Sequence, residues 1–256
     1  LQSAGNRCFP RKVANGMKIL IIRHGEPDYS IDSLTEKGWR EAELLSRRLA
    51  PLGIRDFYVS PLGRAQDTAR PTLEKTGKQA ETLPWLMEFR GRVWDPFGRM
   101  EQKKHIPWNL MPQYWTKCPD LFDKNAWLTH PLLASTGEVR EVYEEIGAGV
   151  EELLLRYGYV REGMLFRCER NSRDTIALFC HFGAGLAILS HLLGVALPVL
   201  WGGFFLPTSS VTTLVTEERV QGEVFFKCMQ VGDTSHLYAG GEPVSSSGLF
   251  PEIYGE

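Results

Sequence analysis

The stretch Met17-Lys18-Ile19-Leu20-Ile21-Ile22-Arg23-His24-Gly25-Glu26 decides the fold of this chain. Five of its first six residues are apolar, and three of these are isoleucine, which predicts a short strand buried on both faces at the centre of a parallel sheet. An arginine, a histidine and a glycine follow the strand directly. Because ligands of open α/β sheets bind beyond the carboxyl ends of the strands, we expect the chemistry of the protein at this turn.

The composition narrows the class of protein. A chain of 256 residues that is 43% hydrophobic and 23% charged can bury a large core and has the make-up of a soluble globular protein. The formal net charge of −2 argues against a general nucleic-acid-binding protein. The five cysteines have neither paired nor metal-like spacing, which favours a reducing compartment. We therefore expect a cytoplasmic protein that needs no metal ion or cofactor.

Two segments call for a check on targeting and membrane insertion. Residues 1–16 hold no continuous apolar run, so they are not a secretory signal, and we expect a loose arm or an expression remnant ahead of the first strand. Residues 176–207 carry no Asp, Glu, Lys or Arg and are long enough to span a bilayer. They also contain two histidines, five glycines and Pro198, so we expect a strand, a turn and a buried helix instead, with no membrane partner.

The rest of the chain alternates between strand and helix patterns, which predicts an α/β fold. Ser135 and Glu138 have the spacing of a capping box at the start of a helix. The expected strands and helices, apart from the opening strand, are the helix 35–52, the strand 56–59, the strand 81–89, the helix that begins near 138, the strand 175–180, the helix 186–193, and the strands 210–216 and 223–230.

A second stretch carries chemistry, Ser60-Pro61-Leu62-Gly63-Arg64-Ala65-Gln66-Asp67-Thr68-Ala69. Ser60 is suited to cap a helix and Pro61 to occupy its first position, which places Arg64 in the first turn. Free N–H groups at a helix N-terminus attract anions, and an arginine adds a two-pronged donor. This stretch therefore predicts an anion site close to the Arg-His-Gly turn.

Together the Arg-His-Gly turn and the Ser-Pro-x-x-Arg-Ala-x-x-Thr string resemble the histidine phosphatase superfamily, which has the phosphoglycerate-mutase-like fold. The resemblance implies one domain over residues 17–256, a three-layer α/β/α sandwich with a mostly parallel central sheet. It also implies an inserted lid at about residues 90–135, where helical and strand periodicity is lost over a long stretch. The four tryptophans of this segment are equally suited to a local core and to a substrate wall.

The resemblance assigns roles to five side chains. His24 is expected to be the nucleophile that forms a phosphohistidine. Arg23, Arg64 and His181, the last of which follows the strand 175–180, are expected to bind the phosphate oxygens and to stabilise the transition state. Glu88 is expected to protonate the leaving group and then to take a proton from water. No P-loop cradle or metal cluster is evident in the sequence, so the phosphate would be held by side chains.

Two of these roles impose electrostatic conditions. The attacking nitrogen of His24 must be unprotonated, which neighbouring arginines favour, and we expect a backbone carbonyl to accept a hydrogen bond from the other ring nitrogen. Glu88 must be partly protonated, which Trp85, Leu86 and Phe89 would favour by excluding water.

The identity of the acid has an alternative. Relatives often have a polar residue just before this glutamate, and a glycine and a Trp-Glu pair after it. Here Met87 precedes Glu88, and Gly91, Trp94 and Asp95 follow it. Asp95 therefore stays open as the proton donor.

The implied function is metal-independent hydrolysis of a phosphomonoester of a small organic molecule. A phosphomutase is the alternative within the family, but phosphoglycerate mutases usually follow Arg-His-Gly-Glu with a serine and a Trp-Asn pair, whereas residues 27–30 here are Pro-Asp-Tyr-Ser. A catalytically silent phosphate-binding module is the alternative outside it, and the presence of all the core residues disfavours it. Aromatic and basic residues at 90–135 suggest an organic substrate with a second negative charge.

Other polar residues are expected to be structural. His191 is predicted to pack within its helix, His105 to lie on the surface of the lid, and His236 to make a structural hydrogen bond. For Glu26, an ion pair with an arginine and a direct role in the site are equally compatible with its place beside the Arg-His-Gly turn.

Overall fold

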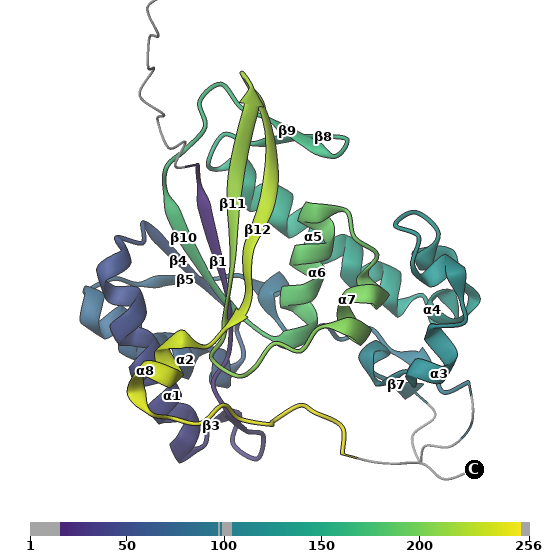
Figure 1. Ribbon diagram of the computed structural model, residues 1–256, viewed down its shortest axis with the longest axis horizontal. Coiled ribbons are helices and arrows are strands. Elements are labelled where there is room, and N and C mark those ends of the chain that lie inside the picture. Colours follow the sequence, from purple (N-terminus) through teal and green to yellow (C-terminus); the bar gives the residue numbers. More distant parts are fainter. Residues whose placement is uncertain (1–15, 97, 99–103, 252–256) are drawn as a thin grey trace, which may run out of the picture.

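The computed structural model describes residues 16–96, 98 and 104–251 (Figure 1). Within these residues, eight strands form one mixed sheet in the order β5-β4-β10-β1-β11-β12-β9-β8. These strands are β1 Lys18–Arg23, β4 Asp56–Val59, β5 Ala80–Thr82, β8 Val160–Glu162, β9 Leu165–Arg167, β10 Thr175–Cys180, β11 Val211–Val220 and β12 Glu223–Asp233. Two short ribbons pair β2 Pro27–Asp28 with β3 Ser33–Leu34, and β6 Val93–Trp94 with β7 Lys104–His105.

The core strands of the sheet are parallel. β5, β4, β10 and β1 pair in parallel, and β1 then pairs antiparallel with β11, which begins the antiparallel part of the sheet. The strand predicted from 17–22 thus lies between two neighbours, and its apolar residues are buried on both faces. In the register of β1 and β10, Arg23 lies opposite Cys180, so the two strands end level with each other.

Helices cover both faces of the sheet, which confirms the predicted three-layer sandwich (Figure 1). Alternate residues of β1 serve the two cores: Leu20 and Ile22 pack with α1 and α2, and Ile19 and Ile21 pack with α5 and α6. The helices are α1 Glu36–Leu49, α2 Gly63–Thr76, α3 Pro112–Trp115, α4 Pro131–Ala134, α5 Glu138–Leu155, α6 Phe182–Leu193, α7 Leu197–Gly203 and α8 Ser235–Gly240.

Three local predictions were wrong. The strand expected over 81–89 ends at Thr82, because Pro84 lacks the N–H that a strand needs and starts a 3-10 turn. α2 begins at Gly63 rather than at Pro61, and the Ser60 hydroxyl accepts from the N–H of Leu62 ahead of the helix, at 3.2 Å.

The third error concerns the capping box. Gly137 precedes α5 with a φ of 76°, so it turns the chain in the left-handed region before the helix begins. The Ser135 hydroxyl donates to the carbonyl of Leu132 and does not cap the helix. The Thr136 hydroxyl accepts from the N–H of Glu138 instead, at 3.3 Å.

The 90–135 segment contains short elements that begin at prolines. Proline suits the first helical position because its ring fixes φ and it needs no N–H partner there. The pieces that start this way are Pro107–Asn109, α3, Pro119–Leu121 and α4. This explains the loss of sequence periodicity. His105 was expected at the surface, but it pairs within the β6–β7 ribbon and is 8% exposed, so that prediction was wrong.

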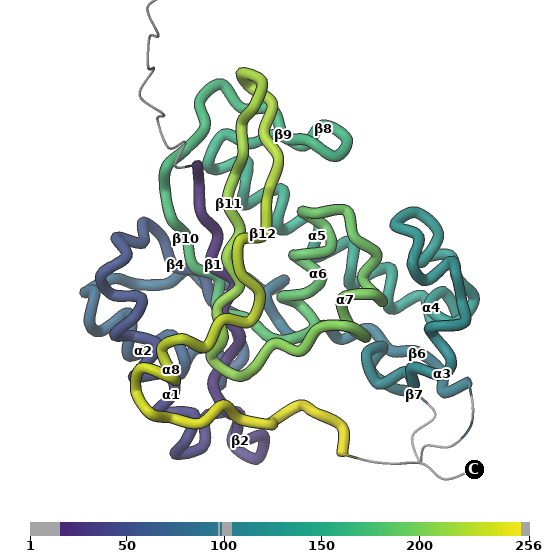
Figure 2. The backbone as a smooth tube through the Cα atoms, in the orientation of Figure 1, coloured from purple at the N-terminus to yellow at the C-terminus, as the bar shows by residue number. Residues whose placement is uncertain are grey.

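The C-terminal segment, residues 241–251, runs from α8 past β2 toward the β6–β7 ribbon (Figure 2). The arm expected at residues 1–16 lies outside the described residues except for its last one. Among the helices of the described ranges, none is both long and apolar enough to cross a membrane. Cys118, Cys168, Cys180 and Cys228 are free thiols.

Candidate active site

The carboxyl ends of three parallel strands bring four predicted side chains to one edge of the sheet. Arg23 ends β1 and His24 follows it, His181 follows β10, and Arg64 lies in the first turn of α2 after β4. Because β1 and β10 end level with each other, the rings of His24 and His181 lie 5.1 Å apart between centroids. With Glu88, these residues form what we call the polar site.

The His24 ring is held in one tautomer. Its Nδ1 lies 2.7 Å from the carbonyl oxygen of Gly25, which can only accept, so Nδ1 carries the hydrogen and Nε2 does not. Burial, reinforced by the charge of Arg23, lowers the pKa of His24 to about 3. The imidazole is therefore neutral near pH 7, with a nitrogen lone pair available at Nε2.

Backbone contacts fix the position of that ring. The His24 N–H donates to the carbonyl of Cys180 at 3.0 Å, and the N–H of Ser209 donates to the carbonyl of His24 at 2.9 Å. The N–H of Gly25 donates to the Thr68 hydroxyl at 2.8 Å, and this hydroxyl donates to the carbonyl of Arg64. Thr68, the last polar residue of the Ser-Pro-x-x-Arg-Ala-x-x-Thr string, thus links the Arg-His-Gly turn to α2.

A buried carboxylate supports the same turn and escaped the sequence analysis. Glu41 on α1 accepts from the N–H of Glu26 and from the hydroxyl of Thr208, both at 2.9 Å. Burial raises the pKa of Glu41. The only sequence signal was a glutamate on the apolar side of a helix, which is unusual without a partner.

Arg64 is oriented by Asp32, which the sequence analysis also missed. Asp32 Oδ1 accepts from Arg64 Nη1 at 2.6 Å, and Oδ2 accepts from the N–H of Gly63 at 2.7 Å. One carboxylate thus caps α2 and fixes its arginine. The ring of Tyr29 lies 5.4 Å from the Arg64 Cζ on another side. Asp32 belongs to a polar loop without periodicity, so its sequence context carried no signal.

Arg23 is 5% exposed and is held by two backbone carbonyls. Its Nη1 donates to the carbonyl of Leu206, and its Nη2 donates to the carbonyl of Ser247 at 3.2 Å. Phe182 and Phe205 lie on its sides, each with a ring centroid 5.7 Å from the Cζ. Burial lowers the pKa of this guanidinium from its usual value.

Three donors of the polar site have no protein partner. Seven buried side-chain nitrogen or oxygen atoms in the described part of the chain lack a hydrogen bond, and Arg23 Nε, Arg64 Nε and His181 Nδ1 are among them. Buried polar atoms in proteins nearly always have a hydrogen-bond partner. Unpaired nitrogen donors on two arginines and a histidine suit the oxygens of a tetrahedral anion.

The hydrogen on His181 follows from its other contact. Its Nε2 lies 2.8 Å from the hydroxyl of Ser60, and this hydroxyl already accepts from the N–H of Leu62. When the Ser60 hydroxyl donates to Nε2, the ring hydrogen of His181 is on Nδ1. Burial, with the charges of the neighbouring cations, lowers the pKa of His181 well below 6.5, so the ring is a neutral donor.

The Glu88 carboxylate lies against the first turn of α6, the helix that follows His181. Its Oε1 accepts from the N–H of Phe89 at 2.8 Å and from that of Ala184 at 3.1 Å. Loss of water contact raises the pKa of Glu88, although these hydrogen bonds and the two arginines oppose the shift. Asp95, the alternative acid, follows β6 on the ribbon.

The other polar residues have structural contacts. His191 Nε2 lies 2.9 Å from Glu151 Oε1, and His236 Nε2 lies 3.1 Å from the Ser209 hydroxyl, so His236 makes the hydrogen bond expected of it. Glu26 accepts from the hydroxyls of Thr35 and Ser245. Over the described ranges, no three His, Cys, Asp or Glu side chains gather in a way that would hold a metal ion.

Comparison with known proteins places this geometry in a family. Residues 19–226 match the sequence model of the histidine phosphatase superfamily (branch 1). A 2,3-bisphosphoglycerate-dependent phosphoglycerate mutase of Thermoplasma acidophilum is 36% identical over 159 residues, which are 50% of this chain and 80% of the relative. Phosphoserine phosphatase 1 of Hydrogenobacter thermophilus is 22% identical over 79% of this chain and 88% of its own length.

Solved structures show the same fold. A phosphoserine phosphatase of Entamoeba histolytica in complex with phosphoserine has a TM-score of 0.55 and 22% identity, and the match covers 86% of this chain and 99% of that one. A mycobacterial glucosyl-3-phosphoglycerate phosphatase has a TM-score of 0.53 and 17% identity, and the match covers 83% and 97% of the two chains.

Proposed function

The chain belongs to the histidine phosphatase superfamily (branch 1), and on that premise we propose that it hydrolyses phosphomonoesters of small organic molecules without a metal ion. The observation that carries this proposal is the state of His24, whose Nε2 has no hydrogen and lies among donors that have no protein partner. A lone pair beside two guanidinium groups and a neutral imidazole is suited to attack a phosphorus atom.

In the first step, His24 Nε2 forms a bond to phosphorus as the bond from phosphorus to the ester oxygen breaks. Arg23, Arg64 and His181 donate to the three other phosphate oxygens and stabilise the charge of the transition state. Glu88 gives its proton to the departing oxygen, so an alcohol leaves. The imidazole gains positive charge, which the Gly25 carbonyl stabilises through Nδ1.

In the second step, water attacks the phosphorus of the phosphohistidine. The Glu88 carboxylate takes a proton from this water as the bond between phosphorus and nitrogen breaks. Inorganic phosphate leaves, and His24 and Glu88 return to their starting protonation states. The raised pKa of Glu88 supports this double role, because a carboxyl group that titrates nearer to neutral pH serves as both acid and base.

A phosphomutase is the second candidate, and the identity of 36% to a phosphoglycerate mutase over half of the chain favours it. A mutase uses the same phosphohistidine but passes the phosphoryl group to a second organic hydroxyl instead of to water. The two candidates therefore differ in the acceptor and not in the polar site.

The test is turnover of p-nitrophenyl phosphate at pH 5 to 8 in the presence of EDTA. We expect release of inorganic phosphate, with oxygen from isotopically labelled water in the product. Release only after divalent metal is added would contradict the metal-independent reaction, and no release under any condition would contradict hydrolysis. Conversion of 3-phosphoglycerate to 2-phosphoglycerate faster than any phosphate release would favour the mutase.

A further inference from the structure

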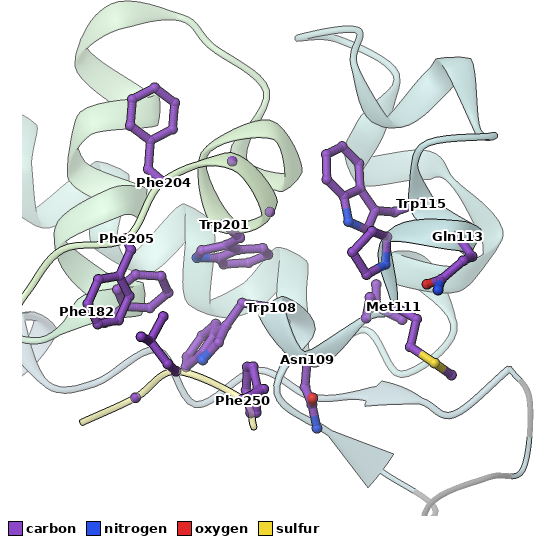
Figure 3. A pocket seen from close by; sticks show the side chains of 16 residues that line it. Trp108, Asn109, Met111, Gln113, Trp115, Phe182, Trp201, Phe204, Phe205 and Phe250 are labelled. Carbon is purple, nitrogen blue, oxygen red and sulfur yellow. The ribbon is translucent and has the colours of Figure 1, made fainter. Parts of the chain in front are cut away.

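Next to the polar site lies a cavity of about 590 Å³, which we call the aromatic cavity (Figure 3). Its described lining residues include no Asp, Glu, Lys, Arg or His. They come from the 90–135 segment, from α6 and α7, from the residues after α7 and from the C-terminal segment. Seven of the described lining residues are aromatic: Trp108, Trp115, Phe182, Trp201, Phe204, Phe205 and Phe250.

We propose that the aromatic cavity binds the leaving group of the substrate, and that this group is an uncharged aromatic alcohol. The inference rests on the proposed phosphatase function and adds a substrate class to it. The volume falls within the range of about 300–1,000 Å³ that is typical of small-molecule sites, which are mostly apolar with few polar groups.

The cavity is continuous with the polar site through Arg23. Phe182 and Phe205 line the cavity and also lie against the Arg23 guanidinium. Gly248 lines it as well, and a Cβ at this position would lie 2.8 Å from Arg23 Nη2. A phosphate bound by Arg23 therefore has the cavity wall directly beside it.

The wall of the aromatic cavity also lies close to the proposed acid, Glu88. The ring of Trp108 lies against Gly183 in the first turn of α6, where a Cβ would be 2.5 Å from the ring. The next residue, Ala184, is the one whose N–H donates to Glu88. The group that protonates the departing oxygen and the wall of the cavity thus share one helical turn, so the alcohol would leave into the cavity.

The rings of the wall contact one another in edge and tilted arrangements. The Trp108 ring makes an edge contact with Phe182 at 5.6 Å between centroids, and a tilted contact with Trp201 at 5.7 Å. Trp115 lies across the cavity from Phe182 and Phe205 (Figure 3). Aromatic groups stack on such walls through offset and edge contacts.

The lining residues that the structure describes carry no cation that would neutralise a second negative charge on the substrate. The sequence suggested such a charge from the basic residues of the 90–135 segment. Two of these cations form ion pairs on α5 instead, Arg90 with Glu145 and Lys104 with Glu138. A carboxylate or second phosphate in the aromatic cavity would lose its hydration without gaining a counter-charge, which is unfavourable.

The test compares three esters whose alcohols are primary alkanols of similar basicity: propyl, 3-phenylpropyl and 3-carboxypropyl phosphate. We expect kcat/KM for the phenylpropyl ester to exceed that for the propyl ester by about 100-fold. The carboxypropyl ester is expected to be no better than the propyl ester. Since the leaving-group chemistry is matched, the ratios report contacts made by the tail.

Variants locate the effect. Trp108→Ala and Phe250→Ala are each expected to lower the ratio of phenylpropyl to propyl turnover by about tenfold. Trp94→Ala is the matched control, because Trp94 belongs to the same segment but is 44% exposed, packs on Lys104 and is not among the lining residues. It should leave the ratio unchanged. Phe250 is 50% exposed, so its truncation tests the proposal even if the Trp108 variant does not fold.

The outcomes separate this inference from the proposed function. Equal kcat/KM for the phenylpropyl and propyl esters would overturn the inference and leave hydrolysis intact, and so would a preference for the carboxypropyl ester. If none of the esters is hydrolysed, the proposed function fails, and binding of 3-phenylpropylphosphonate and propylphosphonate tests the cavity by tryptophan fluorescence. A tighter phenylpropyl complex would support the inference, and equal affinities would overturn it.

Discussion

The polar site and the aromatic cavity are neighbours, but they are built in different ways. Four of the five residues of the polar site lie at the ends of parallel strands or in the first turn of the helix that follows, and backbone groups and neighbouring side chains hold them in place. The aromatic cavity is assembled from separate parts of the chain that are distant in sequence. The sheet therefore positions most of the polar site, whereas the aromatic cavity depends on segments outside the sheet.

Because the polar site and the aromatic cavity are built from different parts of the chain, we expect mutations in them to affect different kinetic constants. Changes in the polar site should lower kcat/KM for every substrate, because they remove contacts to the phosphoryl group that all the esters share. Changes in the aromatic cavity should alter KM and the preference among leaving groups.

Replacing His24 with alanine has the largest expected effect. We expect kcat to fall by about 10⁴-fold or more for every ester, because the polar site would lose the nitrogen proposed to accept the phosphoryl group. The melting temperature should change by only a few degrees, since the lost ring is neutral and its main side-chain partner is the carbonyl next to it. Residual activity near that of the wild type would contradict the role of His24.

Replacing the acid separates Glu88 from Asp95. With Glu88→Gln, we expect a loss of about 10²- to 10⁴-fold on an alkyl phosphate and a much smaller loss on p-nitrophenyl phosphate, whose leaving group needs no proton. Asp95→Asn is the matched change and should have little effect on either ester. A large loss on the alkyl phosphate in Asp95→Asn, with little effect of Glu88→Gln, would assign the role of the acid to Asp95.

Removing Asp32 probes a positioning residue. In Asp32→Ala, Arg64 loses its carboxylate partner and α2 loses its cap, so we expect KM to rise about tenfold across substrates. Asp28→Ala is a suitable control, because this carboxylate at the end of β2 accepts from the backbone N–H and the hydroxyl of Ser30. An Asp32 variant with normal KM and lowered thermal stability would show that the aspartate serves α2 alone.

The pH profile should show the smallest effect. The active form of His24 is the neutral one, and burial lowers its pKa to about 3, so kcat should not fall with a midpoint near 6.5 as pH decreases. Glu88 acts first as the protonated acid, and its pKa is raised, so kcat for an alkyl ester should decline as pH rises through that pKa. Measurement of kcat from pH 4 to 9, in the wild type and in Glu88→Gln, checks both limbs. An acid limb at 6.5 in the wild type would contradict the neutral histidine.

The same comparison explains how much the sequence could predict. β1 and β10 were readable because both faces of each are buried, which produces continuous apolar runs that stop at functional residues. Arg64 could be placed in a first turn even though the helix began two residues later than expected. Asp32 and Glu41 could not be assigned, since their roles depend on contacts across the fold that leave no local pattern.

The aromatic cavity could not be predicted from the sequence for a related reason. Tryptophan serves equally well in a core, in a wall or at a surface, and the four in the 90–135 segment divide in this way. Trp127 is 1% exposed in the core, Trp94 is 44% exposed, and Trp108 and Trp115 line the cavity. Whether a given tryptophan lies in the core, in the cavity wall or at the surface depends on how the short elements of the 90–135 segment pack.

The most direct test of the account is to trap the phosphoenzyme. Wild-type protein is mixed with phenyl phosphate labelled at phosphorus, quenched in alkaline detergent within milliseconds, and digested for peptide mapping. We expect a label that is stable to alkali and labile to acid, on the peptide that contains His24, and no label in His24→Ala. A label on any other residue, or steady turnover by the His24→Ala variant, would contradict it.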